Sequence, residues 1–228
     1  MTWNQLFSSS VGRKIIMSLT GIFLILFLVV HVCLNACIWA NDGGKTFNVA
    51  SHFMGTNVVV RTLEVGLFIF FIIHIVQGLI LTARNRSRRS IGYEQNYGNR
   101  GSRWYARSMG LLGTLVLLFL IVHLANFWVP SRWHQVPEFK PLSSEHVSDL
   151  FGLMQATFSN IIIVIIYVLG CISLAYHLAH GFQSAFRTLG VHNKKYLRML
   201  INIGYGFTII VSLAFIMMPI SMYFGWVK

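Results

Sequence analysis

The most prominent pattern in the chain is a series of five long apolar runs separated by polar segments. A helix crosses the ~30 Å hydrocarbon core of a bilayer in ~20 residues, and each run is about that long or longer. Strands of a membrane barrel would instead be ~10 residues long with alternating polarity. The pattern therefore predicts an all-α membrane protein, one domain over residues 1–228, with five transmembrane helices. The predicted spans are Ile15 to Trp39, Val58 to Ala83, Met109 to Val129, Asn160 to Phe186 and Met199 to Phe224.

The basic residues indicate how these helices are oriented. Cytoplasmic loops of membrane proteins hold an excess of Lys and Arg. In this chain they collect before the first run and in the second and fourth connections, so we expect a cytoplasmic N-terminus and a C-terminus outside. The inner set is Arg13, Lys14, Arg84, Arg86, Arg88, Arg89, Arg100, Arg103, Arg107, Arg187, Lys194, Lys195 and Arg198, and the outer set is Lys45, Arg61, Arg132, Lys140 and Lys228.

The composition agrees with a membrane protein. Hydrophobic residues make up 55% of the chain and charged residues 11%, whereas charged residues are ~25% of a soluble domain. The net charge of +12 does not indicate nucleic-acid binding, because the basic residues lie between apolar runs and not on a soluble scaffold. The cysteines form no C-x-x-C-H motif for covalent haem, and we interpret them as small apolar residues. They are Cys33, Cys37 and Cys171.

The second outer connection, between the third and fourth runs, contains an amphipathic pattern. The apolar residues of the pattern recur at i, i+3, i+4 and i+7, and they are Val147, Leu150, Phe151 and Met154. We expect a helix from about Ser143 to Thr157 that lies on the outer surface and covers the bundle.

In the fifth run, Pro219 is expected to kink or end the helix.

Two matched motifs lie in the second and fourth runs. The segment HIVQGLILTAR begins at His74, the segment HLAHGFQSAFR begins at His177, and both follow the pattern His-x3-Gly-x5-Arg. Two further histidines, His31 and His123, lie deep in the first and third runs. A polar imidazole within a membrane span is costly unless it has a partner. Four such histidines therefore indicate one shared role.

Counting helical residues from the inner boundary places the four histidines at two levels. His31 and His123 each lie sixteen residues from it, which is about 24 Å along an untilted helix. His74 and His177 each lie ten residues from it, or about 15 Å. The boundary residues used for these counts are Ile15, Arg107, Arg84 and Arg187.

Two levels with two imidazoles each suit two haem b groups, each ligated axially by histidines from facing helices. Neutral imidazole is a common haem ligand, and bundle cores often hold cofactors. Gly78 and Gly181 follow the inner histidines by one turn, where a missing side chain would let a porphyrin approach the backbone. Arg84 and Arg187 would either neutralise haem propionates or serve only as positive-inside residues.

The four histidines also allow roles that involve no haem. A single intramembrane histidine is often a packing residue or part of a proton relay, as in a cofactor-free transporter. Zinc would need four ligands at one depth, and the two levels argue against it. His180 is an alternative to His177 as the fourth ligand, although the glycine register and the depth favour His177.

Arg61 and Glu64 lie three residues apart at the outer end of the second run. One interpretation is a structural salt bridge. The other is a quinone site, in which Glu64 takes protons from a quinol oxidised beside the outer haem or exchanges them with a quinone.

These residues resemble the membrane cytochrome b subunit of succinate:quinone oxidoreductases, the single-polypeptide, five-helix, two-haem type of bacterial succinate dehydrogenases and fumarate reductases. The resemblance spans nearly the whole chain, and it implies that His31 pairs with His123 at a distal haem and that His74 pairs with His177 at a proximal haem. The motifs that carry it are LVVHVCLN, HIVQG, IVHLANFW and AYHLAHG.

The resemblance implies an anchor in the bacterial cytoplasmic membrane. Such an anchor carries electrons between a cytoplasmic iron–sulfur subunit, itself bound to a flavoprotein, and membrane quinone, with menaquinone expected here. Dicarboxylate chemistry would take place on the partner subunits. Some members that move protons with the electrons carry a glutamate two residues before the fourth ligand, and this chain has Ala175 there, so we do not expect that proton path. A cytochrome b anchor of a hydrogenase, formate dehydrogenase or nitrate reductase is the alternative.

Overall fold

A computed structural model describes residues 9–87, 104–133, 136–140 and 147–228 of the chain. Over these ranges the chain is helical and has no strand, only an isolated bridge between Glu138 and Ser148. The all-α prediction is confirmed. The elements are α2 (Ser10–Ala36), the 3-10 helix η1 (Cys37–Ala40), α3 (Lys45–Thr56), α4 (Val58–Ser87), α5 (Trp104–Arg107), α6 (Met109–His123), the π-helical turn η2 (Leu124–Trp128), α7 (Val129–Arg132), α8 (Leu150–Phe158), α9 (Ile161–Thr188) and α10 (Lys194–Tyr223).

Five helical segments of the described chain are long and apolar enough to cross a membrane, as predicted. Each extends beyond its predicted span at one end or both, because polar residues continue the helix past the apolar run. Pro219 does not end the last helix, since α10 continues through it to Tyr223. The segments are Ser10–Ala40, Val58–Ser87, Met109–Arg132, Ile161–Thr188 and Lys194–Tyr223.

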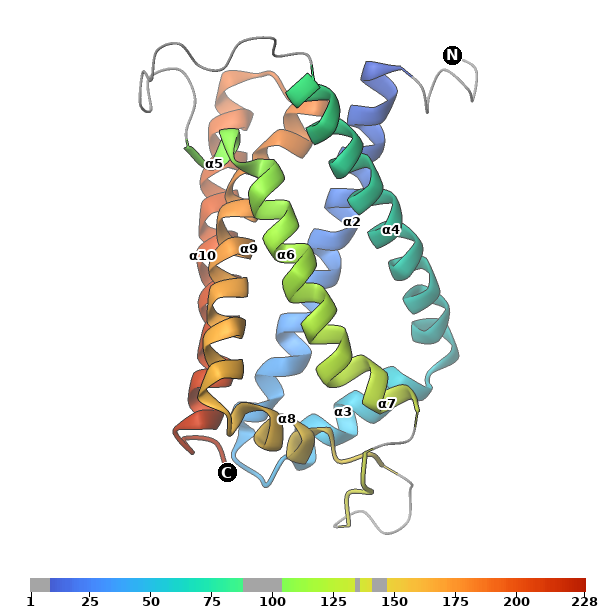
Figure 1. Cartoon of the computed structure of the whole chain (residues 1–228), viewed down its shortest axis with the longest axis vertical. Helices are drawn as coiled ribbons and strands as arrows, with labels where there is room; N and C mark the ends of the chain where they lie inside the picture. Colours follow the sequence, from blue (N-terminus) through green and yellow to red (C-terminus); the bar gives the residue numbers. More distant parts are fainter. Residues whose placement is uncertain (1–8, 88–103, 134–135, 141–146) are drawn as a thin grey trace.

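Helices α2, α4, α6 with its continuation to Arg132, and α9 form a four-helix bundle, and α10 packs beside α9 on its outside (Figure 1). Helix α2 packs against α4 and α9, α6 packs against α9 and more lightly against α4, and α10 packs against α9 and α2. We call the end where α2 begins and α4 ends the inner end, after the predicted topology, and the opposite end the outer end. They are at the top and bottom of Figure 1.

Polar side chains define where several helices begin. Ser9 Oγ accepts a hydrogen bond from Gly12 N at the start of α2, and Asn160 Oδ1 accepts one from Ile162 N at the start of α9. Such N-caps satisfy amide groups that have no partner within the helix.

The third span is not a regular α-helix along its whole length, because a π-helical turn follows His123. Pro130, which has no N–H to donate, lies immediately beyond this turn.

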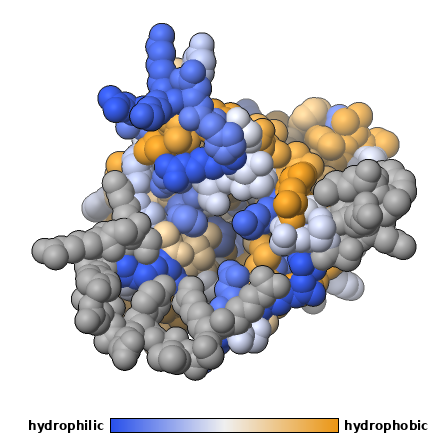
Figure 2. Space-filling model, turned by 90° about the horizontal axis from the view of Figure 1, so that it is seen from above, coloured by the Kyte–Doolittle hydropathy of each residue, from blue (hydrophilic) through white to orange (hydrophobic). Residues whose placement is uncertain are grey.

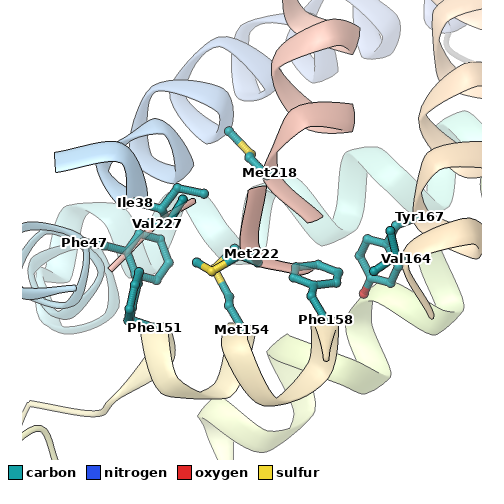
Figure 3. Packing of buried hydrophobic residues seen from close by; sticks show 10 residues of the cluster. All are labelled: Ile38, Phe47, Phe151, Met154, Phe158, Val164, Tyr167, Met218, Met222 and Val227. Atoms are coloured by element: carbon teal, nitrogen blue, oxygen red, sulfur yellow. The ribbon is translucent and has the colours of Figure 1, made fainter. Parts of the chain in front are cut away.

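The outer end is closed by α3, α8 and the last residues of the chain. Helix α8 packs against α3, α9, α10 and η2, so the predicted cover over the bundle is present. Beneath it lies a cluster of large buried side chains, drawn in Figure 3. Its members are Ile38, Phe47, Phe151, Met154, Phe158, Val164, Tyr167, Met218, Met222 and Val227.

One buried amide connects α3 to α8. Asn48 has no exposed surface, its Nδ2 donates to Asp149 Oδ1 at 2.9 Å, and its Oδ1 accepts from Phe151 N at 2.9 Å. Asp149 also caps α8 by accepting from Gly152 N. The two surface helices are therefore held together by a satisfied polar network as well as by apolar packing.

The predicted helix at Ser143 to Thr157 begins too early. Residues 143–146 lie outside the described residues, and Val147 pairs with Phe139 through a backbone hydrogen bond of 2.7 Å instead of lying in a helix. Helix α8 starts at Leu150 because Asp149 caps it.

Helix α3 was not predicted from the sequence. In the first turn of α3, Thr46 donates from its hydroxyl and its backbone N–H to the carboxylate of Asp42. These hydrogen bonds hold the pKa of the Asp42 carboxyl below its usual range.

The outside of the bundle is apolar along its length and polar at its inner end. Helix α4 has no buried residue, and its exposed side chains are mostly aliphatic, which is the surface that lipid requires. Figure 2 views the inner end and shows hydrophilic residues gathered there. Of the predicted inner cations, Arg88, Arg89, Arg100 and Arg103 lie outside the described residues.

Candidate functional site

The structure brings His31 of α2 and His123 of α6 together. Their ring centroids lie 5.7 Å apart with the planes at 86°. Large aromatic rings surround this outer pair: Phe27 stacks on His31 at 5.1 Å, and Phe119 lies 5.8 Å from His123. Phe215 of α10 reaches His31 at 5.6 Å. The outer pair is therefore enclosed by side chains from three helices.

The structure also brings His74 of α4 and His177 of α9 together. Their ring centroids lie 6.2 Å apart at an interplanar angle of 65°. Small residues border this inner pair, because a Cβ added at Gly21 or at Gly113 would lie 3.6 Å from the ring of His74 or of His177, respectively. A larger side chain at either glycine would push against the imidazole. Neither glycine was predicted from the sequence, since neither is close to a histidine in the chain.

His180, the alternative fourth residue, points elsewhere. Its ring lies 6.4 Å from that of Tyr105, whose hydroxyl is 2.7 Å from the hydroxyl of Tyr205. His177, and not His180, therefore faces His74.

Thr20 is the hydrogen-bond partner of His74. Thr20 Oγ1 lies 3.1 Å from His74 Nδ1 and 2.8 Å from the carbonyl oxygen of Ile16. A hydroxyl proton given to Ile16 leaves the hydroxyl oxygen to accept from His74 Nδ1–H, whereas a proton given to His74 requires an unprotonated Nδ1. Only the first arrangement leaves the lone pair on His74 Nε2, the atom that would bind a metal.

The other three histidines have weaker partners or none. Nδ1 of His123 and Nδ1 of His177 are buried without a hydrogen-bond partner. Nδ1 of His31 lies 3.5 Å from Asn35 Nδ2, which already donates to the carbonyl of His31 at 2.8 Å. Among the described residues, nothing hydrogen-bonds to Nε2 of any of the four histidines. Buried imidazoles without protein partners need another one.

Both separations have the length expected if the two imidazoles of a pair were to share one metal ion. A metal–imidazole bond is about 2.0 Å, so two such bonds plus the ring radii place the centroids about 6 Å apart. The observed values are 5.7 Å and 6.2 Å. The donors are paired nitrogens, which is the ligand set of a bis-histidine haem. No group of three or more metal-binding side chains occurs in the part of the chain described here.

The two glycines predicted to let a porphyrin approach the backbone, Gly78 and Gly181, differ in the space around them. A Cβ added at Gly181 would meet no atom within 4 Å, whereas at Gly78 it would meet the terminal Cε of Met17 at 3.2 Å. A side-chain carbon therefore fits freely beside Gly181, and beside Gly78 it fits only if the flexible end of Met17 moves. Arg84 and Arg187 are exposed at the inner end.

Glu64 lies in an ionic cluster between α4 and the third span. Arg61 Nη1 donates to Glu64 Oε2 at 2.9 Å, so the predicted salt bridge is present. Arg132 Nη2 donates to both carboxylate oxygens, at 2.9 Å and 2.8 Å. Trp128 Nε1 donates to Oε1 at 2.7 Å. Three donors thus hold a carboxylate that is 19% exposed.

This cluster connects Glu64 to the helix that carries His123. Trp128 ends the π-helical turn that follows His123, and Arg132 ends α7. Neither partner was predicted from the sequence, because both come from another span. Arg132 is one of the few outer cations, which is the only signal in the sequence that could have found it.

Searches of protein-family models, curated proteins and solved structures found no match to this chain.

Proposed function

We propose that this chain is the dihaem cytochrome b anchor of a succinate:quinone oxidoreductase. The observation that carries the proposal is the presence of two facing histidine pairs, at 5.7 Å and 6.2 Å, on the four helices of one membrane bundle. Two haem b groups would supply one-electron transfer along the bundle. Flavoprotein and iron–sulfur subunits on the inner face would exchange electrons with the inner group.

Each histidine pair has a defined role in this proposal. His74 and His177 hold the proximal haem, and His31 and His123 hold the distal haem. A Cβ at Gly181 would meet no atom within 4 Å, which would let the ring approach the backbone of α9 there. Arg84 and Arg187 stand at the inner boundary, where they compensate negative charge from propionates.

Glu64 is the proposed proton-exchanging group of a quinone site at the outer end. Oxidation of a quinol releases protons as well as electrons, so a carboxylate near the outer haem is needed to accept them. Among the described residues, Glu64 accepts four hydrogen bonds, from Arg61, Arg132 and Trp128. Glu64 therefore accepts a proton only when one of these donors moves away, and the exposed Arg61 is the easiest to displace.

The test is to purify the membrane complex and measure haem b per chain by pyridine haemochrome. Two haems per chain are expected, and addition of succinate or fumarate should change their absorbance. A preparation without a Soret band would exclude the proposal in favour of a cofactor-free protein. Two haems that respond to neither dicarboxylate would keep the cytochrome and exclude the succinate:quinone assignment.

A further inference from the structure

We infer that Thr20 is a positioning residue for the inner haem, which fixes the tautomer of His74 and lowers the reduction potential of the iron. The inference rests on the proposed function, because it concerns the same ligand. It adds a residue outside the histidine motifs, on a different helix from the ligand it controls.

The hydroxyl of Thr20 is buried, so its hydrogen-bond partners are limited to nearby protein atoms. Thr20 is 2% exposed, so no water competes for its hydroxyl oxygen. The hydroxyl lies 2.8 Å from the carbonyl of Ile16 and 3.1 Å from that of Met17, one helical turn before it. In the proposed arrangement these two acceptors take the hydroxyl proton, and the hydroxyl oxygen, 3.1 Å from His74 Nδ1, accepts from Nδ1–H. The imidazole then carries its proton on Nδ1, which leaves Nε2 free to bind the iron.

The neighbouring residue also orients His74. Gly21 follows Thr20, and a Cβ there would lie 3.6 Å from Cε1 and 4.0 Å from Nδ1 of the same ring. The imidazole thus lies about one side-chain carbon away from the backbone of α2 at Gly21, while Nδ1–H bonds to Thr20. Two successive residues of α2 set both the position and the protonation of a ligand on α4.

The electronic consequence follows from the hydrogen bond. A metal-bound imidazole that donates its second N–H to an acceptor is a more basic ligand. A more basic ligand stabilises ferric iron more than ferrous iron, so the reduction potential falls. Nδ1 of His177, the other proposed ligand, has no hydrogen-bond partner among the described residues, so Thr20 would be the main hydrogen-bond control on this haem.

The experiment compares Thr20→Val, Thr20→Ser and Thr114→Val in the full membrane complex. Valine keeps the shape of threonine and removes the acceptor, whereas serine keeps the hydroxyl. Thr114 is the control for the hydrogen bond, because its hydroxyl also donates to a carbonyl one turn earlier, at 2.9 Å, and no hydrogen bond joins it to a histidine among the described residues. The readouts are a spectroscopic redox titration of each haem and the rate of haem loss to a haem-free acceptor protein.

In Thr20→Val the potential of the inner haem should rise, and this haem should be lost about 10- to 100-fold faster, the usual effect of removing such a partner. A tenfold change in relative affinity for the two oxidation states corresponds to about 59 mV. Thr20→Ser should restore the wild-type values, and Thr114→Val should match the wild type. The outer haem should not change in any variant.

An unchanged inner haem in Thr20→Val, or an equal change in Thr114→Val, would overturn the role of Thr20. Either result would leave the two haems and their ligands in place. Absence of haem from the wild-type complex would instead overturn the proposed function. The two failures are therefore distinguishable.

Discussion

The outer and inner halves of the bundle hold their histidine pairs by different means. Around His31 and His123 the chain places large aromatic rings, and beyond them two surface helices close the end over a buried cluster. Around His74 and His177 it places glycines and one threonine. The outer pair is held by tertiary packing of bulky side chains, whereas the inner pair is bordered by glycines and contacted by the hydroxyl of Thr20.

This difference indicates which changes each half should tolerate. Packing of bulky groups is distributed over many contacts, so single truncations are partly absorbed. Beside Gly21 and Gly113 there is room for a Cβ at 3.6 Å from an imidazole, but a side chain that extends beyond Cβ must displace the ring. We therefore expect variants near the inner pair to act on one cofactor, and variants at the outer end to act on stability or on quinone chemistry.

The largest expected effect comes from removing the ligands. His74→Ala or His177→Ala should eliminate the inner haem, and His31→Ala or His123→Ala should eliminate the outer one, because each pair ligates a single iron. Pyridine haemochrome should fall from two haems per chain to one, with complementary losses in the reduced spectrum. If His31→Ala and His74→Ala removed the same spectral component, the separation into two levels would be wrong.

Replacement of Glu64 should affect only the outer half. Glu64→Gln keeps a carbonyl oxygen for Trp128 and Arg132 but cannot take up a proton at neutral pH. Quinol oxidation should fall about 100-fold, the lower range for loss of a general base, with both haems retained. Thr62→Val is the control, because Thr62 is exposed on the same helix and its hydroxyl donates to the carbonyl oxygen of Val58 and not to Glu64. Unchanged turnover in Glu64→Gln would limit Glu64 to a structural role.

Gly181→Val tests the space beside the inner pair. A Cβ at Gly181 meets no atom of the protein within 4 Å, so packing alone predicts no effect. If a porphyrin lies there, the added side chain will displace it, and the inner haem should fall to well below one per chain. Gly66→Val is the control, since Gly66 is equally open and lies in the same kind of helix. Full haem content in Gly181→Val would place the ring elsewhere.

Much of the fold follows from the sequence, because a continuous apolar run of membrane length leaves a chain few alternatives to a helix. The same regularity accounts for the pairing of the histidines. Helices that alternate in direction make depth countable, and the residues counted to one level, such as His74 and His177, do meet in the structure. Whether they ligate iron stays a prediction.

The remaining features depend on geometry that no local pattern encodes. The contact of Thr20 with His74 joins two helices through their relative rotation. The contacts of Trp128 and Arg132 with Glu64 depend on a π-helical turn that changes which way the following residues face. The start of α8 was missed because Asp149 caps a helix in the middle of an otherwise continuous apolar pattern.

The smallest expected effect concerns the cover at the outer end, which has no counterpart at the inner end among the described residues. Asn48→Ala removes an amide that bonds to both Asp149 and Phe151 N, leaving buried polar groups without partners. We expect the free energy of unfolding to fall by about 2 kcal/mol, measured by thermal or denaturant unfolding in detergent. Lys45→Ala, exposed on the same helix, should change it by no more than about 0.5 kcal/mol. Because the cover packs on the outer half, any loss of haem in Asn48→Ala should begin with the outer haem. Earlier loss of the inner haem would show that the two halves are not independent.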